Sequence, residues 1–252
     1  MIQTLLSPLF LFVLSFCLPA SSALAQSRAS GAGFDLTATD GIRFLADAGR
    51  YEATGNVQLV VGDWVVLADR IVASLDAQHV RMERLLAEGT VFVQSGTFKA
   101  RAASLELRLQ APKVELRGAP VSVQMADDRM VTAGSLSFLI DAGELRIDQD
   151  FVLQTRGAVI AGGRASMMTV DGVLDALHVQ GGVDVERDGF RAAAESLRLD
   201  RENNLISLEG AVVLQSGDVL LSGISATFDL ESGAVNINND TSGRVSGALR
   251  SQ

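Results

Sequence analysis

Residues 182–200 read GVDVERDGFRAAAESLRLD, a stretch in which apolar and polar side chains alternate. Val183 and Val185 alternate with acidic residues, and two leucines flank Arg198. A period of two residues is typical of a β-strand that buries one face and exposes the other to water. Gly189 separates the two alternating runs, as expected of the turn in a hairpin. The stretch therefore predicts two antiparallel strands.

The same pattern recurs as a unit of about thirty residues, and a period of this length indicates a repeat architecture. Most units open with a glycine before an apolar strand, and a second glycine stands seven residues further on, as Gly55 and Gly62 do. A small residue then precedes the next apolar run, as Ala68 precedes Ile71. Asp150 stands where the fourth unit should have its first glycine. The units begin at residues 55, 89, 118, 150, 182 and 210.

The predicted fold is all-β, an elongated stack of antiparallel β repeats over residues 34–238. One unit cannot bury its apolar face alone, so neighbouring units must share one elongated core. Two facing sheets of this kind would form a sandwich or a rolled trough with open ends. The positions predicted to face inward are Val57, Leu59, Val91, Val93, Leu105, Leu107, Val121, Val123, Leu136, Phe138, Val183, Val185, Leu197, Leu199, Val212, Leu214 and Phe228.

Residues 1–25 are predicted to be a signal peptide that is cleaved on export. They carry no charged side chain, and an apolar core over residues 5–16 precedes a small-x-small pattern that ends at Ala25. Because no basic residue stands near the start, a retained membrane anchor stays open as an alternative. Residues 26–33 are expected to be a flexible leader and residues 239–252 a polar tail.

Composition excludes several classes of function. Cys17 is the only cysteine and falls in the predicted signal peptide, so no disulfide, thiolate nucleophile or cysteine-bound zinc is expected in the mature chain. The formal net charge of −9 argues against nucleic-acid binding, which needs a basic surface.

His79 and His178 lie in different units, and the pair Asp127 and Asp128 lacks the spaced ligands of a calcium loop, so no metal site and no cofactor are expected. The acidic pairs lie on outward faces without a convergent partner. No catalytic residue and no enzymatic activity are therefore predicted.

One segment carries a family resemblance. Residues 51–59 read YEATGNVQL and are followed by Gly62-Asp63 and by residues 68–71, which read ADRI. These motifs resemble the OstA-like family, which includes LptA, LptC and the N-terminal domain of LptD. The resemblance is specific over residues 42–76 and recurs more weakly to residue 238. It implies an elongated β-jellyroll, also called a β-taco, whose interior holds the lipid A acyl chains of lipopolysaccharide in the periplasm.

The resemblance also implies roles for residues. The inward positions would line a lipid groove, and the protein would bind lipopolysaccharide and bridge inner- and outer-membrane components. Terminal edge strands would join LptC-like or LptD-like jellyroll partners, or a second copy head to tail, by strand addition. The residues predicted to make these edge contacts are Phe34, Leu36, Ile42, Val235 and Ile237.

Two other classes of function stay open. Alternating valines by themselves favour an ordinary packed core, and a self-associating β-solenoid that serves as a structural scaffold of the cell envelope would fit such a core. A polysaccharide lyase on a β-solenoid would need clustered basic residues with Asp or Tyr on one outer face. Tyr51 is the single tyrosine and the basic residues are scattered, so the lyase is the least favoured class.

Overall fold

The computed structural model describes residues 26–31, 33–125, 129–170, 173–187, 189–239 and 246–249. The predicted signal peptide lies outside the described residues. Within them the chain is all-β as predicted, apart from one 3-10 turn, η1 (Ala46–Ala48). No helix in this part of the chain is long and apolar enough to cross a membrane.

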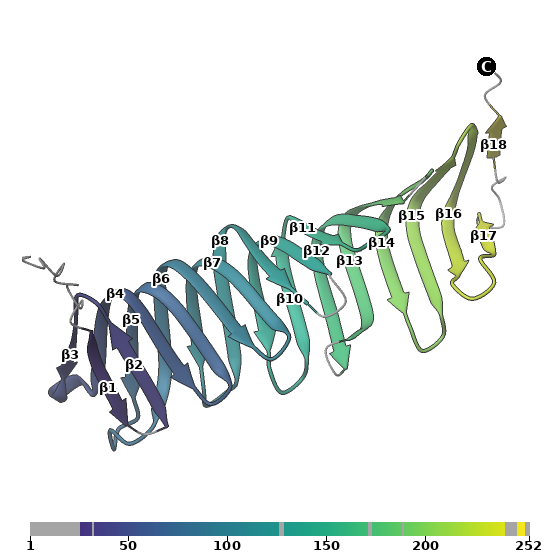
Figure 1. The fold of residues 1–252 in the computed structure, drawn as a ribbon. Coiled ribbons are helices and arrows are strands. Elements are labelled where there is room, and N and C mark those ends of the chain that lie inside the picture. Colours follow the sequence, from purple (N-terminus) through teal and green to yellow (C-terminus); the bar gives the residue numbers. More distant parts are fainter. Residues whose placement is uncertain are drawn as a thin grey trace, which may run out of the picture.

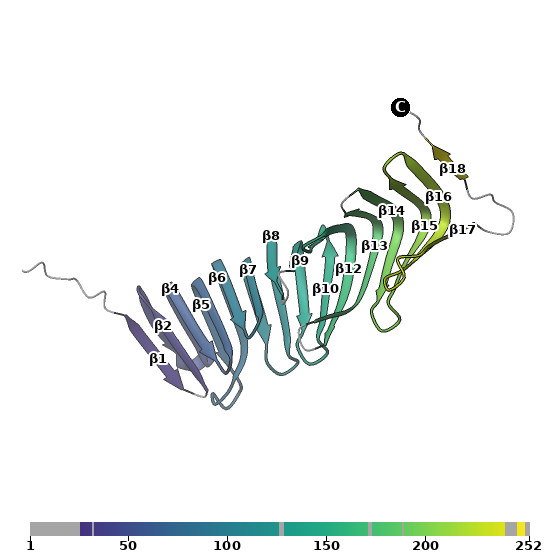
Figure 2. The ribbon, with the colours of Figure 1, turned by 45° about the vertical axis from the view of Figure 1, so that its right-hand side comes forward.

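The strands follow one another along a single elongated body (Figures 1 and 2). Their bounds are β1 (Ser27–Gly31), β2 (Phe34–Ala38), β3 (Gly41–Leu45), β4 (Arg50–Val61), β5 (Trp64–Leu75), β6 (Met82–Ser95), β7 (Phe98–Arg108), β8 (Lys113–Gln124), β9 (Met130–Leu139), β10 (Glu144–Gln149), β11 (Phe151–Gln154), β12 (Ala158–Val170), β13 (Val173–Arg187), β14 (Phe190–Asp200), β15 (Leu205–Ser216), β16 (Val219–Asp229), β17 (Val235–Asn238) and β18 (Ser246–Leu249). Pairing is antiparallel throughout, and the long strands pair with their neighbours in sequence. The short strands share a partner: β2 and β3 both pair with β4, β10 and β11 both pair with β9 and β12, and β17 and β18 both pair with β16.

Most long strands bend near their middle, where the pairing register shifts, for example between Thr54 and Val57 of β4. The bends divide the sheet into two arms that face each other. Arm 1 holds the segments joined by the turns at residues 62–63, 96–97 and 217–218, and arm 2 those joined at residues 109–112, 140–143 and 201–204. The turns form the rim of each arm. This is the predicted trough, with its spine along the bends.

The spine shows why glycine recurs in each unit. Gly89 has a φ of +96°, which side-chain-bearing residues rarely adopt, and a Cβ atom there would collide with the carboxylate of Asp69. That carboxylate accepts a hydrogen bond from the backbone N–H of Thr90 at 2.9 Å. Asp150, which replaces the glycine in the fourth unit, has a φ of +56° and separates β10 from β11. Aspartate is one of the few residues that tolerate this conformation.

Both chain ends contain a strand. The expected flexible leader, residues 26–33, contains β1, which pairs with β2, and Arg28 forms an ion pair with Asp35 at 2.6 Å. The expected polar tail contains β18, which pairs with β16. Both segments are poor in apolar residues, which suggested disorder. The neighbouring strand supplies backbone hydrogen-bond partners for both, and these do not depend on side chains.

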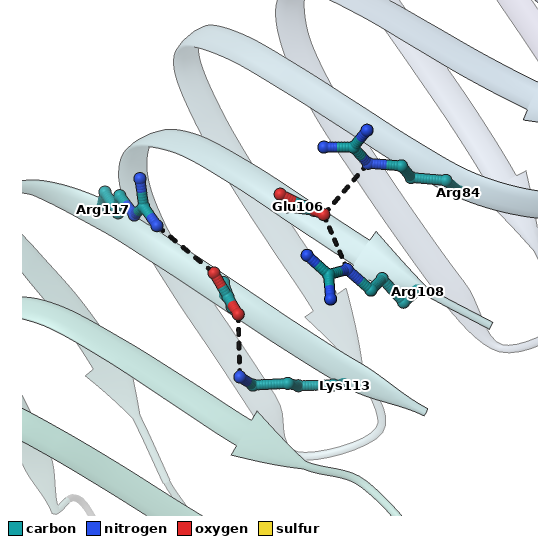
Figure 3. Close-up of polar contacts among 6 residues, drawn as sticks. Arg84, Glu106, Arg108, Lys113 and Arg117 are labelled. Carbon is teal, nitrogen blue, oxygen red and sulfur yellow. Dashed lines mark hydrogen bonds and ion pairs between the residues drawn. The ribbon is translucent and has the colours of Figure 1, made fainter. Parts of the chain in front are cut away.

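The outer face of arm 2 carries ion pairs across neighbouring strands (Figure 3). Glu106 accepts hydrogen bonds from Arg84 at 3.0 Å and from Arg108 at 2.8 Å. Both bonds lower the pKa of Glu106, with Arg84 the larger cause. Polar groups of this kind stay outside, because no polar or charged residue of the described chain is buried.

Candidate lipid-binding groove

The structure places all the positions predicted to face inward on the inner surfaces of the two arms. Most are fully buried. Phe138, Val185, Leu199 and Phe228 are partly buried and pack against the same core. Whether these residues contact lipid stays a prediction.

The mouth of the trough, where the two rims face each other, is bridged by aromatic pairs. Phe98 lies beside the rim of arm 1 and stacks on Phe138 beside the rim of arm 2, with ring centroids 5.5 Å apart and planes inclined by 12°. Phe190 and Phe228 meet edge to face at 5.5 Å. Pairs of this kind contribute about 0.5–1.5 kcal/mol beyond the area they bury. They hold the rims together at two places along the mouth.

An apolar cavity of about 410 Å³ opens beside the second aromatic pair. Its volume lies within the range of about 300–1,000 Å³ that is usual for small-molecule sites. Arg187 and Asp229 lie among the residues around it, so charged groups are available near the apolar wall. The apolar wall includes Ile160, Val185, Phe190, Leu197, Ile206, Phe228 and Val235.

A smaller cavity of about 260 Å³ lies at the first aromatic pair. Its wall is also apolar over most of its extent, and it opens between the two rims. The apolar residues that line it are Phe98, Val123, Met125, Phe138, Ile140 and Leu145.

The two cavities use only part of the predicted lining. Val185, Leu197 and Phe228 line the larger cavity, and Val123 and Phe138 line the smaller one. Other predicted positions, such as Val57, Leu59 and Val91, are buried in the packed core instead.

Sequence reasoning missed several lining residues. Phe98 and Phe190 contact facing aromatics but were not among the predicted positions. Phe98 stands two residues after the second glycine of its unit, and Phe190 stands directly after that of its own. A phenylalanine that recurs at this point of the unit could have indicated the aromatic contacts. Ile206 and Val235 also line the larger cavity, although Val235 was predicted only as an edge contact.

Of the residues predicted to make edge contacts, some lie on strands at an edge of the sheet and others do not. Phe34 and Leu36 are not at an edge, because β1 and β4 pair with β2 on its two sides and both side chains are buried. Ile42 lies on β3, for which the structure gives pairing with β4 alone, and Val235 and Ile237 lie on β17, paired with β16 alone. Val235 is 45% exposed and lines the larger cavity, so this cavity reaches the C-terminal edge.

Among the described residues, no group of three or more His, Cys, Asp or Glu side chains could hold a metal ion. The pair Asp127 and Asp128 lies outside the described residues.

The comparison with protein families concerns the first half of this trough. Residues 42–144 match the family described as LptA/(LptD N-terminal domain) LPS transport protein. This segment belongs to that family. The OstA-like resemblance is therefore confirmed for residues 42–144, the segment that the family model covers.

Among solved structures, the chain is similar to LptH of Pseudomonas aeruginosa, the LptA homologous periplasmic component of the lipopolysaccharide transport device. The two share 14% sequence identity with a TM-score of 0.44 over 49% of this chain and 95% of LptH. No curated protein matches the chain.

Proposed function

We propose that this protein binds the acyl chains of lipopolysaccharide in its trough and carries them between membrane components. The supporting observation is the apolar cavity of about 410 Å³ beside the pair Phe190 and Phe228, which opens to the mouth and reaches the C-terminal edge strand. An acyl chain bound there would have apolar walls on both arms and an exit beside β17.

The energy of transfer explains the use of such a trough. Exposing a CH₂ group to water costs ~0.8 kcal/mol, so a twelve-carbon chain costs on the order of 9 kcal/mol. A wall of Ile, Val and Leu removes this cost without specific hydrogen bonds. Because such a wall has no deep polar trap, an acyl chain can slide from one repeat to the next.

The periplasmic location and the bridging role are parts of the same proposal. They are supported by the family of residues 42–144 and by the edge strands at the two ends of the trough. Partners would add a strand beside β17 or β3. Replacement of Ile237 by proline should abolish pull-down of a jellyroll partner, and undiminished pull-down would contradict the role of this edge.

A site-specific crosslinking experiment tests the groove. A photo-crosslinking residue at position 185 should capture lipopolysaccharide in cells, because Val185 lines the larger cavity. The matched control is position 186, because Glu186 is its exposed neighbour on the opposite face of the same strand. Equal capture from both positions would contradict binding inside the trough.

A structural scaffold is the second candidate, because the inward residues of the first repeats are almost fully buried against one another. A scaffold would purify without lipid and would form filaments. Mass spectrometry of the organic extract of the purified full-length protein separates the two functions: acylated saccharide supports transport, and its absence from filament-forming protein supports the scaffold.

A further inference from the structure

The outer face of arm 1 carries a basic hollow of about 590 Å³, formed on the other side of the wall that holds the smaller apolar cavity. Among the described residues, four cationic side chains line it and no acidic residue does, although the chain as a whole has a net charge of −9. The cations are Lys99, Arg101, Arg129 and Arg156.

Strand register explains how this hollow arises. Arg101 stands between Phe92 and Ser122 on the neighbouring strands, and Lys99 stands opposite Gln124. All of these positions alternate with inward residues, so they share the outer face. Lys99 and Arg101 therefore lie two residues apart on the outer face of β7, and the residues paired with them on the neighbouring strands are not acidic.

Lys99 and Arg101 make no ion pair within the part of the chain that the structure describes. The guanidinium of Arg101 lies over the ring of Phe92, 5.9 Å from its centroid, which orients it. Like charges this close repel one another, and an anion placed among them relieves that repulsion. Serine, threonine and glutamine side chains around the hollow add hydrogen-bonding groups.

The same rim segment lines the apolar cavity on its inner face. Phe98 precedes Lys99 and Val123 precedes Gln124, so consecutive residues point into the apolar cavity and into the basic hollow. Only the thickness of one sheet separates the two. Building on the proposed function, we propose that this rim binds a phosphorylated amphiphile, with its acyl chain inside at Phe98 and its phosphate outside on Lys99 and Arg101.

Two ligands with the same chain separate the parts of this site. Dodecyl phosphate and dodecylphosphocholine share a twelve-carbon chain, and the choline group of the second cancels the negative charge. Both are used below their aggregation concentration with the full chain, together with inorganic phosphate alone. Trp64 is the reporter, because it is the only tryptophan and its ring lies 6.0 Å from that of Phe98.

The wild-type protein should bind dodecyl phosphate about tenfold more tightly than dodecylphosphocholine, and inorganic phosphate at least about tenfold more weakly than dodecyl phosphate. The preference for phosphate should decline with added salt. In the double variant Lys99→Gln/Arg101→Gln the two amphiphiles should bind equally, at the affinity of dodecylphosphocholine for the wild type. The matched control is Arg164→Gln/Arg198→Gln, which removes two exposed cations elsewhere and should keep the preference.

The outcomes distinguish the two proposals. If the wild type binds both amphiphiles equally, or if Lys99→Gln/Arg101→Gln keeps the preference, the rim site is wrong while the groove stands. If inorganic phosphate binds as tightly as dodecyl phosphate, the hollow is an anion site independent of the groove, and the rim site is again wrong. If neither amphiphile changes the Trp64 fluorescence, the rim site is wrong, while crosslinking at position 185 decides separately whether the larger cavity binds lipid.

Discussion

The two ends of the trough differ in how far their interior is covered. At the N-terminal end, Tyr51 contacts Phe34 and Phe44 at ring-centroid distances of 5.4 and 4.5 Å, and these aromatic rings cap the core. At the C-terminal end, Val235 of the last strand segment is 45% exposed and the adjoining cavity is open. A repeat stack buries its interior only where a neighbour or a cap covers it. The protein therefore has one sealed end and one accessible end.

Equivalent positions in the two halves show the same difference. Val93 and Val185 are structurally equivalent, since they pair with Ala100 and Ala192, yet Val93 is fully buried and Val185 lines the larger cavity. Leu107 is 2% exposed, whereas its counterpart Leu199 is only partly buried. The same alternation of residues thus produces a packed core around Leu107 and the larger open cavity beside Val185.

The largest expected effect follows from truncating the two leucines. Leu107→Ala removes a fully packed side chain and should lower the free energy of unfolding by about 2–5 kcal/mol. Leu199→Ala should cost less than about 2 kcal/mol, because part of that side chain already faces open space. Urea denaturation of both variants measures the difference. Equal losses would mean that the C-terminal half is packed as tightly as the N-terminal half.

The spine should not differ between the halves. Gly89 and Gly210 have φ values of +96° and +79°, and a Cβ at each would collide with a carboxylate, of Asp69 and Glu195 respectively. Either Gly→Ala variant should lower the free energy of unfolding by about 2 kcal/mol or more. Gly62→Ala is the control: its φ is +55° but nothing lies within 4 Å of the added atom, so a loss of about 1 kcal/mol is expected. A much smaller loss at Gly210 would show that the spine is looser in the open half.

The pair Val93 and Val185 links packing to ligand binding. Val93→Phe overfills a closed core and should lower the free energy of unfolding by about 1–3 kcal/mol. Val185→Phe has a cavity of about 410 Å³ to enter, so stability should change little while lipopolysaccharide binding weakens. Denaturation and lipid binding of the purified variants check both statements. Unchanged lipid binding by Val185→Phe would place the ligand elsewhere.

The sequence predicts the repeat and the inward rows, because both depend on local alternation and on recurring glycine positions, but it does not predict the bends within the strands. Asp150 illustrates this, since its place in the unit already marked it as a substitute for glycine. The pairing of β1 escaped prediction because Ser27–Gly31 has no apolar face.

The site is less visible in the sequence. Phe98 and Phe138 lie on different strands and meet across the mouth. Whether they meet depends on the distance between the two arms, which the sequence does not show. Ala100 and Ala192 are equivalent and both buried, so residue type does not show which half holds the larger cavity. Whether a cavity is open depends on how the units stack and on how the ends of the stack are covered. The sequence of a single unit does not determine this.

The smallest expected effect concerns the ion pairs on the outer face. The two hydrogen bonds that lower the pKa of Glu106 stabilise the folded state by about 0.2–1 kcal/mol when the carboxylate is charged. A lowered pKa in the folded state means that this stabilisation is complete above the pKa of the unfolded chain, about 4.3, and is lost as the pH falls through the lower folded value.

Glu106→Gln should therefore have a lower free energy of unfolding than the wild type at pH 7. At a pH below the folded-state pKa of Glu106, the two free energies should be nearly equal. Glu186→Gln is the matched change in the open half, where the partner Arg191 and Glu186 are 71% and 64% exposed. Solvent screening there should leave a difference at pH 7 that is close to zero. Denaturation at a series of pH values gives both curves. Parallel curves for the two variants would mean that the outer faces of the two halves hold their charges equally, and that the asymmetry is confined to the interior.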